Sequence, residues 1–175
     1  LVKKNVLIAR ADTECLVEES LKIIPKNASK NILDIGTGSG CIIISLLLER
    51  KKCYGTGVDI SKDAINIAKI NAKIQQLKNR LKFFKSDIDK FYLGKYDFIL
   101  SNPPYIKSEK IDYLDEDIRF FEPRIALDGG RDGLSKIKTV IDKSSILLKR
   151  KGKLLIEIGA EQTVFLKSYL RLKGF

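Results

Sequence analysis

The sequence predicts an α/β fold with a mostly parallel β-sheet. Short apolar runs rich in Ile, Val and Phe alternate with helical patterns of about ten to fifteen residues, which is the pattern of βαβ units. A glycine-rich turn follows the first apolar run, and an Asn-Pro-Pro-Tyr segment follows the fourth. Ligands of such sheets bind outside the carboxyl ends of the strands, so we expect both turns to lie at a binding crevice.

Strands and helices are expected to alternate along the chain. We expect strands at 31–35, 53–58, 81–85, 96–101 and 153–158. Apolar residues at helical spacing predict helices at 41–50, from a cap at Ser61 to about residue 77, and at 134–148. A further helical pattern precedes Lys173. The segment 106–132 is polar and aromatic, with the length typical of functional loops, so we expect it to form part of a substrate surface.

Length and composition indicate one domain. At 175 residues with 44% apolar content the chain can bury a substantial core, and no linker rich in Pro, Gly or Ser divides it. No run approaches the roughly 18 apolar residues of a membrane span. The start of the chain also lacks a signal-peptide pattern. We therefore expect a cytoplasmic protein with no membrane partner.

The cysteines and the missing histidine exclude several kinds of site. Cys15, Cys41 and Cys53 are odd in number and lack Cys-x-x-Cys spacing, so we expect reduced thiols, two of them buried. The chain contains no histidine, which excludes Ser-His and Cys-His nucleophile pairs and the usual histidine-containing metal sites. No metal is expected.

The chain is strongly basic. Lys and Arg number 33 against 22 Asp and Glu, a formal net charge of +11. Such a charge suits a phosphate-rich partner, but a solvated, lysine-rich surface accounts for it equally well because the lysines are spread along the chain. A nucleic-acid partner is therefore left open without being required.

The glycine-rich turn predicts a binding site for a nucleoside. Glycine stands at every second position of Gly36-Thr37-Gly38-Ser39-Gly40, between a predicted strand and a predicted helix, so the backbone can approach a ligand closely. Asp59 follows about twenty residues later at the tip of the next strand, where a carboxylate can accept hydrogen bonds from ribose hydroxyls.

The same turn argues against a phosphate-containing ligand. The third glycine of the dinucleotide pattern is replaced by Cys41, and the Lys-Ser/Thr pair of a phosphate-binding loop is missing. Asp34 adds negative charge that would repel pyrophosphate but suit an ammonium group. S-adenosylmethionine meets these requirements, with its adenine against Ile60 and Ile88 near Asp87. Asp87 could equally be an ordinary cap at the end of a strand.

The segment Asn102-Pro103-Pro104-Tyr105 predicts a pocket for a planar NH₂ group. The two prolines lack backbone donors, so the carbonyls of Asn102 and Pro103 stay free to accept hydrogen bonds. The Asn102 amide both donates and accepts, and Tyr105 offers a flat aromatic face. Amides and nucleobase amines carry such a group. A rigid turn after a strand is the plainer interpretation of the same residues.

Taken together, these segments resemble the release factor glutamine methyltransferases, a family of protein-glutamine N-methyltransferases. The resemblance covers essentially the whole chain and rests on the segments 6–14, 34–40, 102–105, 122–123, 128–134 and 157–159. It implies a class I S-adenosylmethionine-dependent methyltransferase fold, Rossmann-like, with helices on both faces of the sheet. The implied reaction methylates the side-chain amide of the glutamine in the Gly-Gly-Gln motif of a class I peptide chain release factor, leaving S-adenosylhomocysteine.

The resemblance also implies roles for residues. It places Gly36 to Gly40, Asp59, Ile88 and Asn102 at the cofactor. It places Asn102 to Tyr105 around the substrate glutamine. From the chemistry of that segment we expect Asn102 and the Pro103 carbonyl to accept the two amide N–H bonds, and Tyr105 to pack against the glutamine.

The chain departs from the family pattern at several places. Ala9 and Ala11 stand where the family usually has proline, and Ile88 stands where a large aromatic typically covers adenine. We expect residues 1–175 to be a single catalytic domain that lacks the family's N-terminal helical domain and its last C-terminal strands. A sheet edge left without those strands would be unpaired.

Two other functions fit parts of the sequence. The first is methylation of an adenine or guanine amine in nucleic acid, because an Asn-Pro-Pro-Tyr segment serves that chemistry too and the chain is basic. The second is a binding module that has kept the fold and lost catalysis, which Ile88 favours and the intact Asn102 to Tyr105 segment opposes.

Overall fold

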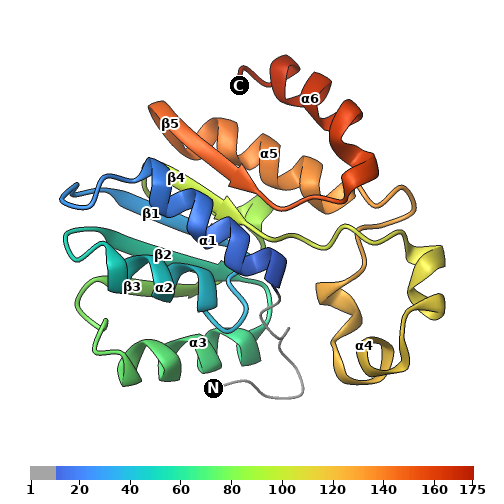
Figure 1. Ribbon diagram of the computed structural model, residues 1–175, viewed down its shortest axis with the longest axis horizontal. Helices are drawn as coiled ribbons and strands as arrows, with labels where there is room; N and C mark the ends of the chain where they lie inside the picture. The colour runs from blue at the N-terminus through green and yellow to red at the C-terminus, as the bar shows by residue number, and fades with distance from the viewer. Residues whose placement is uncertain (1–10) are drawn as a thin grey trace.

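The computed structural model describes residues 11–175, and its centre is a five-stranded parallel sheet (Figure 1). In this part of the chain the strand order is β3-β2-β1-β4-β5. The strands are β1 (Asn31–Ile35), β2 (Tyr54–Asp59), β3 (Leu81–Lys85), β4 (Tyr96–Ser101) and β5 (Leu148–Ile156). The order reverses between β1 and β4, so a crevice is expected beyond the carboxyl ends of these two strands.

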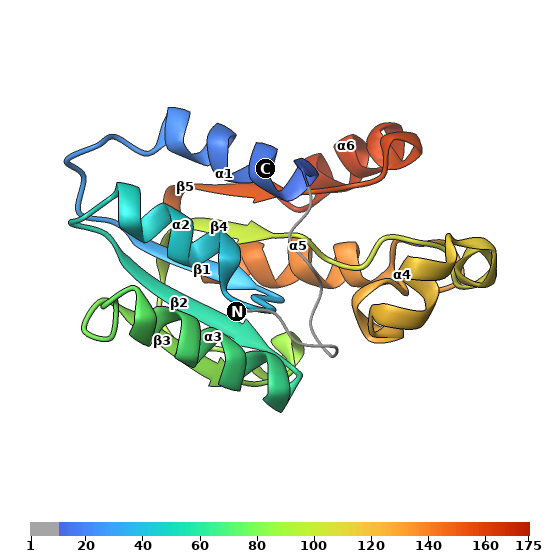
Figure 2. The ribbon, with the colours of Figure 1, turned by 60° about the horizontal axis from the view of Figure 1, so that its bottom comes forward.

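Helices cover both faces of the sheet. The α-helices are α1 (Ala11–Ile23), α2 (Cys41–Glu49), α3 (Lys62–Ile74), α4 (Glu116–Phe121), α5 (Ser135–Leu147) and α6 (Thr163–Leu172). Short 3₁₀ turns are η1 (Ile88–Lys90), η2 (Ser108–Tyr113), η3 (Arg124–Ala126) and η4 (Ala160–Gln162). Helices α1, α2 and α3 lie on one face and α5 on the other, while α6 packs beside α5 (Figures 1 and 2). The α/β fold and the parallel sheet are therefore confirmed.

Alternating side chains of β1 and β4 divide the core between the two faces. Ile32 and Leu100 join the cluster that faces α1 and α2, whereas Leu33 and Ile99 join the cluster that faces α5. All four side chains are fully buried. A central strand buried on both faces is apolar throughout, which is why these runs could be recognised in the sequence.

The long segment after β4 folds back on itself and contains η2, α4 and η3. A parallel bridge joins Ile106 to Asp128, and the Gly129 N–H donates to the Ile106 carbonyl at 2.8 Å. The two ends of the segment thus meet, and α4 projects beyond the arrowheads of β4 and β5 (Figure 1). The segment 106–132, expected to be a loop, contains short helices of its own and lies at the end of the sheet where β1, β2 and β4 terminate.

Some expected boundaries were wrong. Helix α1 was not predicted, and the part of the 6–14 segment before residue 11, including Ala9, lies outside the described residues. Strand β5 begins at Leu148 and ends at Ile156 instead of spanning 153–158. Its charged start lies at the sheet edge, where a bulge shifts the pairing with β4 and lysines are tolerated. Residues 149–151 near the start of β5 are charged and do not alternate with apolar ones, so they carry no strand pattern in the sequence.

The other helices and strands lie within a few residues of their expected positions. Helices α2, α3 and α5 end at Glu49, Ile74 and Leu147, slightly before the expected ends, and β2 is displaced by one residue. The expectation of two buried cysteines was wrong. Cys53 is buried, Cys41 is half-buried and Cys15 is exposed on α1. All three are free thiols, as predicted.

Candidate active site and cofactor pocket

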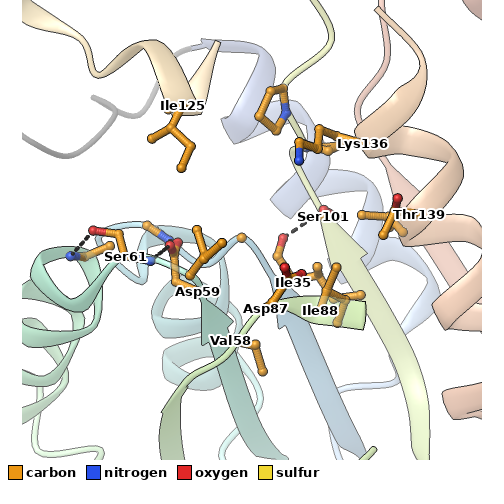
Figure 3. A pocket seen from close by; sticks show the side chains of 18 of the residues that line it. Ile35, Val58, Asp59, Ser61, Asp87, Ile88, Ser101, Ile125, Lys136 and Thr139 are labelled. Atoms are coloured by element: carbon orange, nitrogen blue, oxygen red, sulfur yellow. Dashed lines mark hydrogen bonds between the residues drawn. The ribbon is translucent and has the colours of Figure 1, made fainter. Parts of the chain in front are cut away.

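A cavity of about 230 Å³ opens at the carboxyl ends of β1, β2 and β4 (Figure 3). Its floor is formed by the ends of these strands, among them Ile35, Val58 and Ser101. The Ser101 hydroxyl donates to the Ile35 carbonyl at 2.8 Å and ties β4 to β1 at this point. The crevice predicted from the strand order is therefore present, and both predicted loops reach it.

The glycine-rich turn reaches the cavity through two of its five residues. Gly36 and Gly38 line the cavity wall. Gly36 has φ 71°, and a Cβ built on it would meet nothing within 4 Å. The backbone conformation therefore requires glycine there, and the space above it is open to a ligand.

Asp34, Thr37, Ser39 and Gly40 do not line the cavity but lie buried behind its wall. The Thr37 hydroxyl donates to Asp34 Oδ2 at 2.7 Å, which ties the turn to the end of β1. Burial raises the pKa of the Asp34 carboxyl to about 7, and the hydrogen bond from Thr37 opposes that rise. These residues shape the turn from behind.

Asp59 is the carboxylate that reaches the cavity from β2. Its Oδ2 accepts the Gly38 N–H at 2.9 Å and its Oδ1 accepts the Ser61 N–H at 2.8 Å. Burial raises the pKa of Asp59, while the two backbone donors oppose the shift. Each carboxylate oxygen retains a further lone pair, so both can accept from a ligand.

Ile60, Asp87 and Ile88 form the wall next to Asp59. Ile60 is 50% exposed and Ile88 is half-buried, so both offer apolar surface to a flat ring. The Asp87 side chain also caps η1 by accepting the Asp89 N–H at 3.2 Å. Asp87 therefore both caps η1 and lines the cavity.

A buried lysine supports this wall from α5. Lys143 is 5% exposed, its Nζ donates to the Asp89 carbonyl at 2.8 Å, and it lies 3.7 Å from the centroid of the Tyr92 ring. This contact fastens η1 to α5. The sequence did not indicate it, because the lysine and its partners are separated by more than fifty residues.

Helix α5 and the segment 106–132 form the opposite side of the cavity. Lys136 and Thr139, one helical turn apart on α5, line it together with Ile125 of η3 (Figure 3). None of these three residues was individually expected from the sequence to line a site. Three carboxylates, those of Asp59, Asp87 and Asp89, line the cavity against this one lysine, so the wall favours a cationic ligand over an anionic one.

The Asn102-Pro103-Pro104-Tyr105 segment separates the main cavity from a smaller one. Asn102, Pro103 and Pro104 line both, whereas Tyr105 and Glu157 line only the smaller cavity of about 20 Å³. Among the described residues, no backbone donor reaches the Pro103 carbonyl. The segment thus exposes acceptors between two compartments, as the sequence led us to expect.

Hydrogen bonds from distant segments hold Asn102 and Tyr105. Asn102 Nδ2 donates to Thr13 Oγ1 of α1 at 3.0 Å. The Tyr105 hydroxyl donates to Glu157 Oε1 at 3.3 Å, and Thr13 Oγ1 donates to Glu157 Oε2 at 3.5 Å. Thr13 and Glu157 both belong to segments that carry the family resemblance, but their contacts could not be inferred from the sequence.

The backbone around Tyr105 is also fixed by close packing. Gln162 is 6% exposed, and its Nε2 donates to the carbonyls of Tyr105 and Gly133, each at 3.0 Å. A Cβ on Gly129 would lie 2.9 Å from the Pro104 carbonyl oxygen, so only glycine allows this approach. The glycines of the 128–134 segment therefore pack against the Asn-Pro-Pro-Tyr turn.

No group of three or more Cys, Asp or Glu side chains lies in an arrangement that could hold a metal ion in residues 11–175. In the same part of the chain, no helix has the length and apolarity needed to cross a membrane.

Comparisons with known proteins agree with this geometry. The family model described as "Methyltransferase small domain" matches residues 13–119. A release factor glutamine methyltransferase from Caulobacter vibrioides is 38% identical over 174 residues, covering 99% of this chain and 60% of the relative. One of the same name from Clostridium acetobutylicum is 38% identical over 177 residues, covering 99% and 62%. The chain spans about 60% of the length of these curated relatives, and the predicted resemblance is confirmed.

Solved structures share the fold at lower identity. The ribosomal protein L11 methylase from Lactobacillus delbrueckii subsp. bulgaricus has a TM-score of 0.66 at 19% identity, covering 96% of this chain and 71% of that one. A SAM-dependent methyltransferase from Geobacter sulfurreducens, in complex with S-adenosyl-L-homocysteine, has a TM-score of 0.58 at 17% identity, covering 85% and 48%. The fold is thus that of the class I methyltransferases, and the chain belongs to the methyltransferase small domain family.

Proposed function

We propose that this chain is the catalytic domain of an S-adenosylmethionine-dependent methyltransferase whose substrate is the glutamine of the Gly-Gly-Gln motif in a class I peptide chain release factor. The observation that carries the proposal is the Asn102-Pro103-Pro104-Tyr105 segment between two cavities. The names of the relatives at 38% identity support the same substrate. A release factor as substrate implies that the protein acts in the cytoplasm.

The residues of the main cavity suit S-adenosylmethionine. Asp59 would accept hydrogen bonds from the ribose hydroxyls, because a carboxylate only accepts and both its oxygens have lone pairs to spare. Ile60 and Ile88 would pack against the adenine. The excess of carboxylates over lysine on the wall fits a cationic ligand better than a phosphate. When bound, this cofactor supplies an electrophilic methyl group on a sulfonium.

Of the residues predicted to contact the cofactor, Asp34, Thr37, Ser39 and Gly40 are proposed to act from behind the wall. Their burial leaves direct contact to Gly36 and Gly38 of the same turn. The Thr37 bond to Asp34 would hold the turn in its left-handed conformation while the ligand binds and leaves.

The substrate glutamine is proposed to approach Asn102 and Pro103 from the side of the smaller cavity. Asn102 Oδ1 and the Pro103 carbonyl would each accept one N–H of the substrate amide, and Tyr105 would pack against the side chain. An amide nitrogen is a weak nucleophile because its lone pair is delocalised into the carbonyl. Held by two acceptors, the nitrogen can turn its lone pair toward the neighbouring cavity.

The transfer forms a bond between the amide nitrogen and the methyl carbon as the carbon–sulfur bond breaks. The bonding electrons would leave with the sulfur of S-adenosylhomocysteine, and the methylated nitrogen would release one proton to water. The methylated nitrogen is acidic, so no base is needed beforehand. Positioning of this kind contributes up to ~7–11 kcal/mol in favourable systems.

Transfer of labelled methyl from S-adenosylmethionine tests the proposal. The acceptors are a class I release factor, its variant with Gln→Ala in the Gly-Gly-Gln motif, total RNA and DNA. We expect label on the intact release factor alone. Label on nucleic acid would instead support the amine methyltransferase favoured by the +11 charge. No label on any acceptor, with S-adenosylhomocysteine still bound, would support a binding module.

A further inference from the structure

Three segments far apart in the sequence form one hydrogen-bonded chain beside the two cavities. It runs from Asn102 Nδ2 to Thr13 Oγ1 at 3.0 Å, from Thr13 Oγ1 to Glu157 Oε2 at 3.5 Å, and ends with the Tyr105 hydroxyl on Glu157 Oε1 at 3.3 Å. Thr13 comes from α1, Asn102 and Tyr105 follow β4, and Glu157 follows β5. Thr13 is 5% exposed, although it is polar.

The single hydroxyl proton of Thr13 decides which way the Asn102 amide faces. A carboxylate oxygen can only accept, so the Thr13 proton is used toward Glu157. The Thr13 oxygen is then left as an acceptor and must be met by the NH₂ end of Asn102, as it is. With its NH₂ end held there, Asn102 keeps its carbonyl oxygen for another partner.

We propose that Thr13 is a positioning residue that holds the Asn102 amide with its oxygen directed at the substrate NH₂ group. Glu157 anchors both ends, because its two oxygens accept from Thr13 and from Tyr105. The importance of this orientation for methyl transfer rests on the proposed function. The orientation of the Asn102 amide does not depend on that function, and it can be measured without any substrate.

An amide turned the other way would present N–H groups to the N–H groups of a substrate amide. Two donors facing each other form no hydrogen bond and repel, so the nucleophilic nitrogen would not be held. Thr13 therefore acts through Asn102, and it does not touch the reacting atoms.

The test compares Thr13→Val, which keeps the size of the side chain but loses the hydroxyl, with Thr13→Ser, which keeps the hydroxyl. The matched control is Thr163→Val, which removes a hydroxyl at the start of α6 that donates a hydrogen bond to the Ala160 carbonyl of η4. Four quantities are measured: kcat and KM for the release factor, Kd for S-adenosylhomocysteine, and the NMR signal of the Asn102 side-chain NH₂, which is assigned by its loss in Asn102→Ala.

In Thr13→Val we expect the Asn102 NH₂ signal to shift and its exchange with water to accelerate, and kcat to fall by roughly 10- to 100-fold. Kd for S-adenosylhomocysteine should stay within about twofold, because the hydroxyl does not line the cofactor cavity. Thr13→Ser should recover most of the lost kcat and the wild-type NMR signal.

Several results would overturn the inference. One is an unchanged Asn102 signal in Thr13→Val, and this readout applies whatever the substrate is. Others are equal losses of kcat in the Val and Ser variants, or a loss of kcat matched by weaker cofactor binding. Absence of transfer to the release factor by the wild-type protein would defeat the proposed function instead, and the NMR signal would still decide the role of Thr13.

Discussion

Asp59 is the residue whose chemistry is best defined at the proposed cofactor cavity. Both carboxylate oxygens already accept backbone N–H bonds, from Gly38 and from Ser61. The substitution Asp59→Asn would set an NH₂ group against one of these backbone donors and remove the charge. Hydrogen bonds to charged groups contribute about 1.5–3 kcal/mol, so we expect the affinity for S-adenosylhomocysteine to fall by roughly 10- to 100-fold.

Isothermal titration calorimetry measures this change directly. Asp63→Asn is the matched control, because Asp63 is exposed in the first turn of α3. Equal affinities of wild type and Asp59→Asn would show that the ribose hydroxyls bind elsewhere. Since burial raises the pKa of Asp59, acid should weaken cofactor binding at a higher pH than an exposed aspartate would require.

The sequence pointed to several of the residues that line the cavity, but not to the contacts that hold them in place. Gly36, Gly38, Asp59, Ile88 and Asn102 lie at or just after the ends of strands, and all strands of a parallel sheet end at the same edge, so their convergence could be predicted. The contacts of Thr13, Lys143 and Gln162 could not be predicted from the sequence. Each of these contacts joins residues that are far apart in the sequence. Whether they meet depends on how the helices pack against the sheet, which the local sequence pattern does not indicate.

At the scale of structural elements, the side chain of Lys143 connects η1 to α5. Lys143 reaches from α5 to the Asp89 carbonyl and the Tyr92 ring. Lys143→Met keeps the apolar stem but loses the donor and the cation, so η1 should loosen. We expect the affinity for S-adenosylhomocysteine to fall about three- to tenfold, corresponding to a lost hydrogen bond of roughly 0.5–1.5 kcal/mol.

Calorimetry checks this prediction, with thermal unfolding recorded beside it. Lys138→Met removes the same charge from α5, but Lys138 contacts Asp132 and the Phe165 ring instead, so its cofactor affinity should match that of the wild type. If Lys143→Met and Lys138→Met bind alike, the wall formed by η1 does not depend on α5.

Across the whole molecule, Asp34 links stability to pH. Its pKa is raised by burial to about 7 from 3.8, so between these values the folded state holds a proton that the unfolded state has released. This contribution to stability is fully present below pH 3.8 and is lost as the pH rises through about 7.

Asp34→Asn removes this titration and can still accept from Thr37. The unfolding free energy of Asp34→Asn minus that of the wild type should therefore increase between pH 5 and pH 8. At about 1.4 kcal/mol per pH unit, the rise amounts to at most about 3 kcal/mol. Urea denaturation of both proteins at several pH values measures it, and a difference that stays constant with pH would contradict the raised pKa.

The sequence predicted the fold as a whole more securely than the bounds of β5 and the presence of α1. The central strands β1 and β4 are buried on both faces and apolar throughout, so they were found with accurate boundaries. The start of β5 and helix α1 were missed. Charged residues at a bulged edge strand are solvated, and α1 has only a narrow apolar face, so neither leaves a strong periodic signal.

The most direct test of the account is to locate the transferred methyl group by tandem mass spectrometry of a release factor after reaction with this protein and S-adenosylmethionine. We predict N-methylglutamine in the Gly-Gly-Gln motif, and a rate lower by about 100-fold or more with Asn102→Ala, while the exposed Asn79→Ala leaves the rate unchanged. A methyl group on another residue, or an equal rate with Asn102→Ala, would contradict the assignment of the Asn102 to Tyr105 segment as the glutamine site.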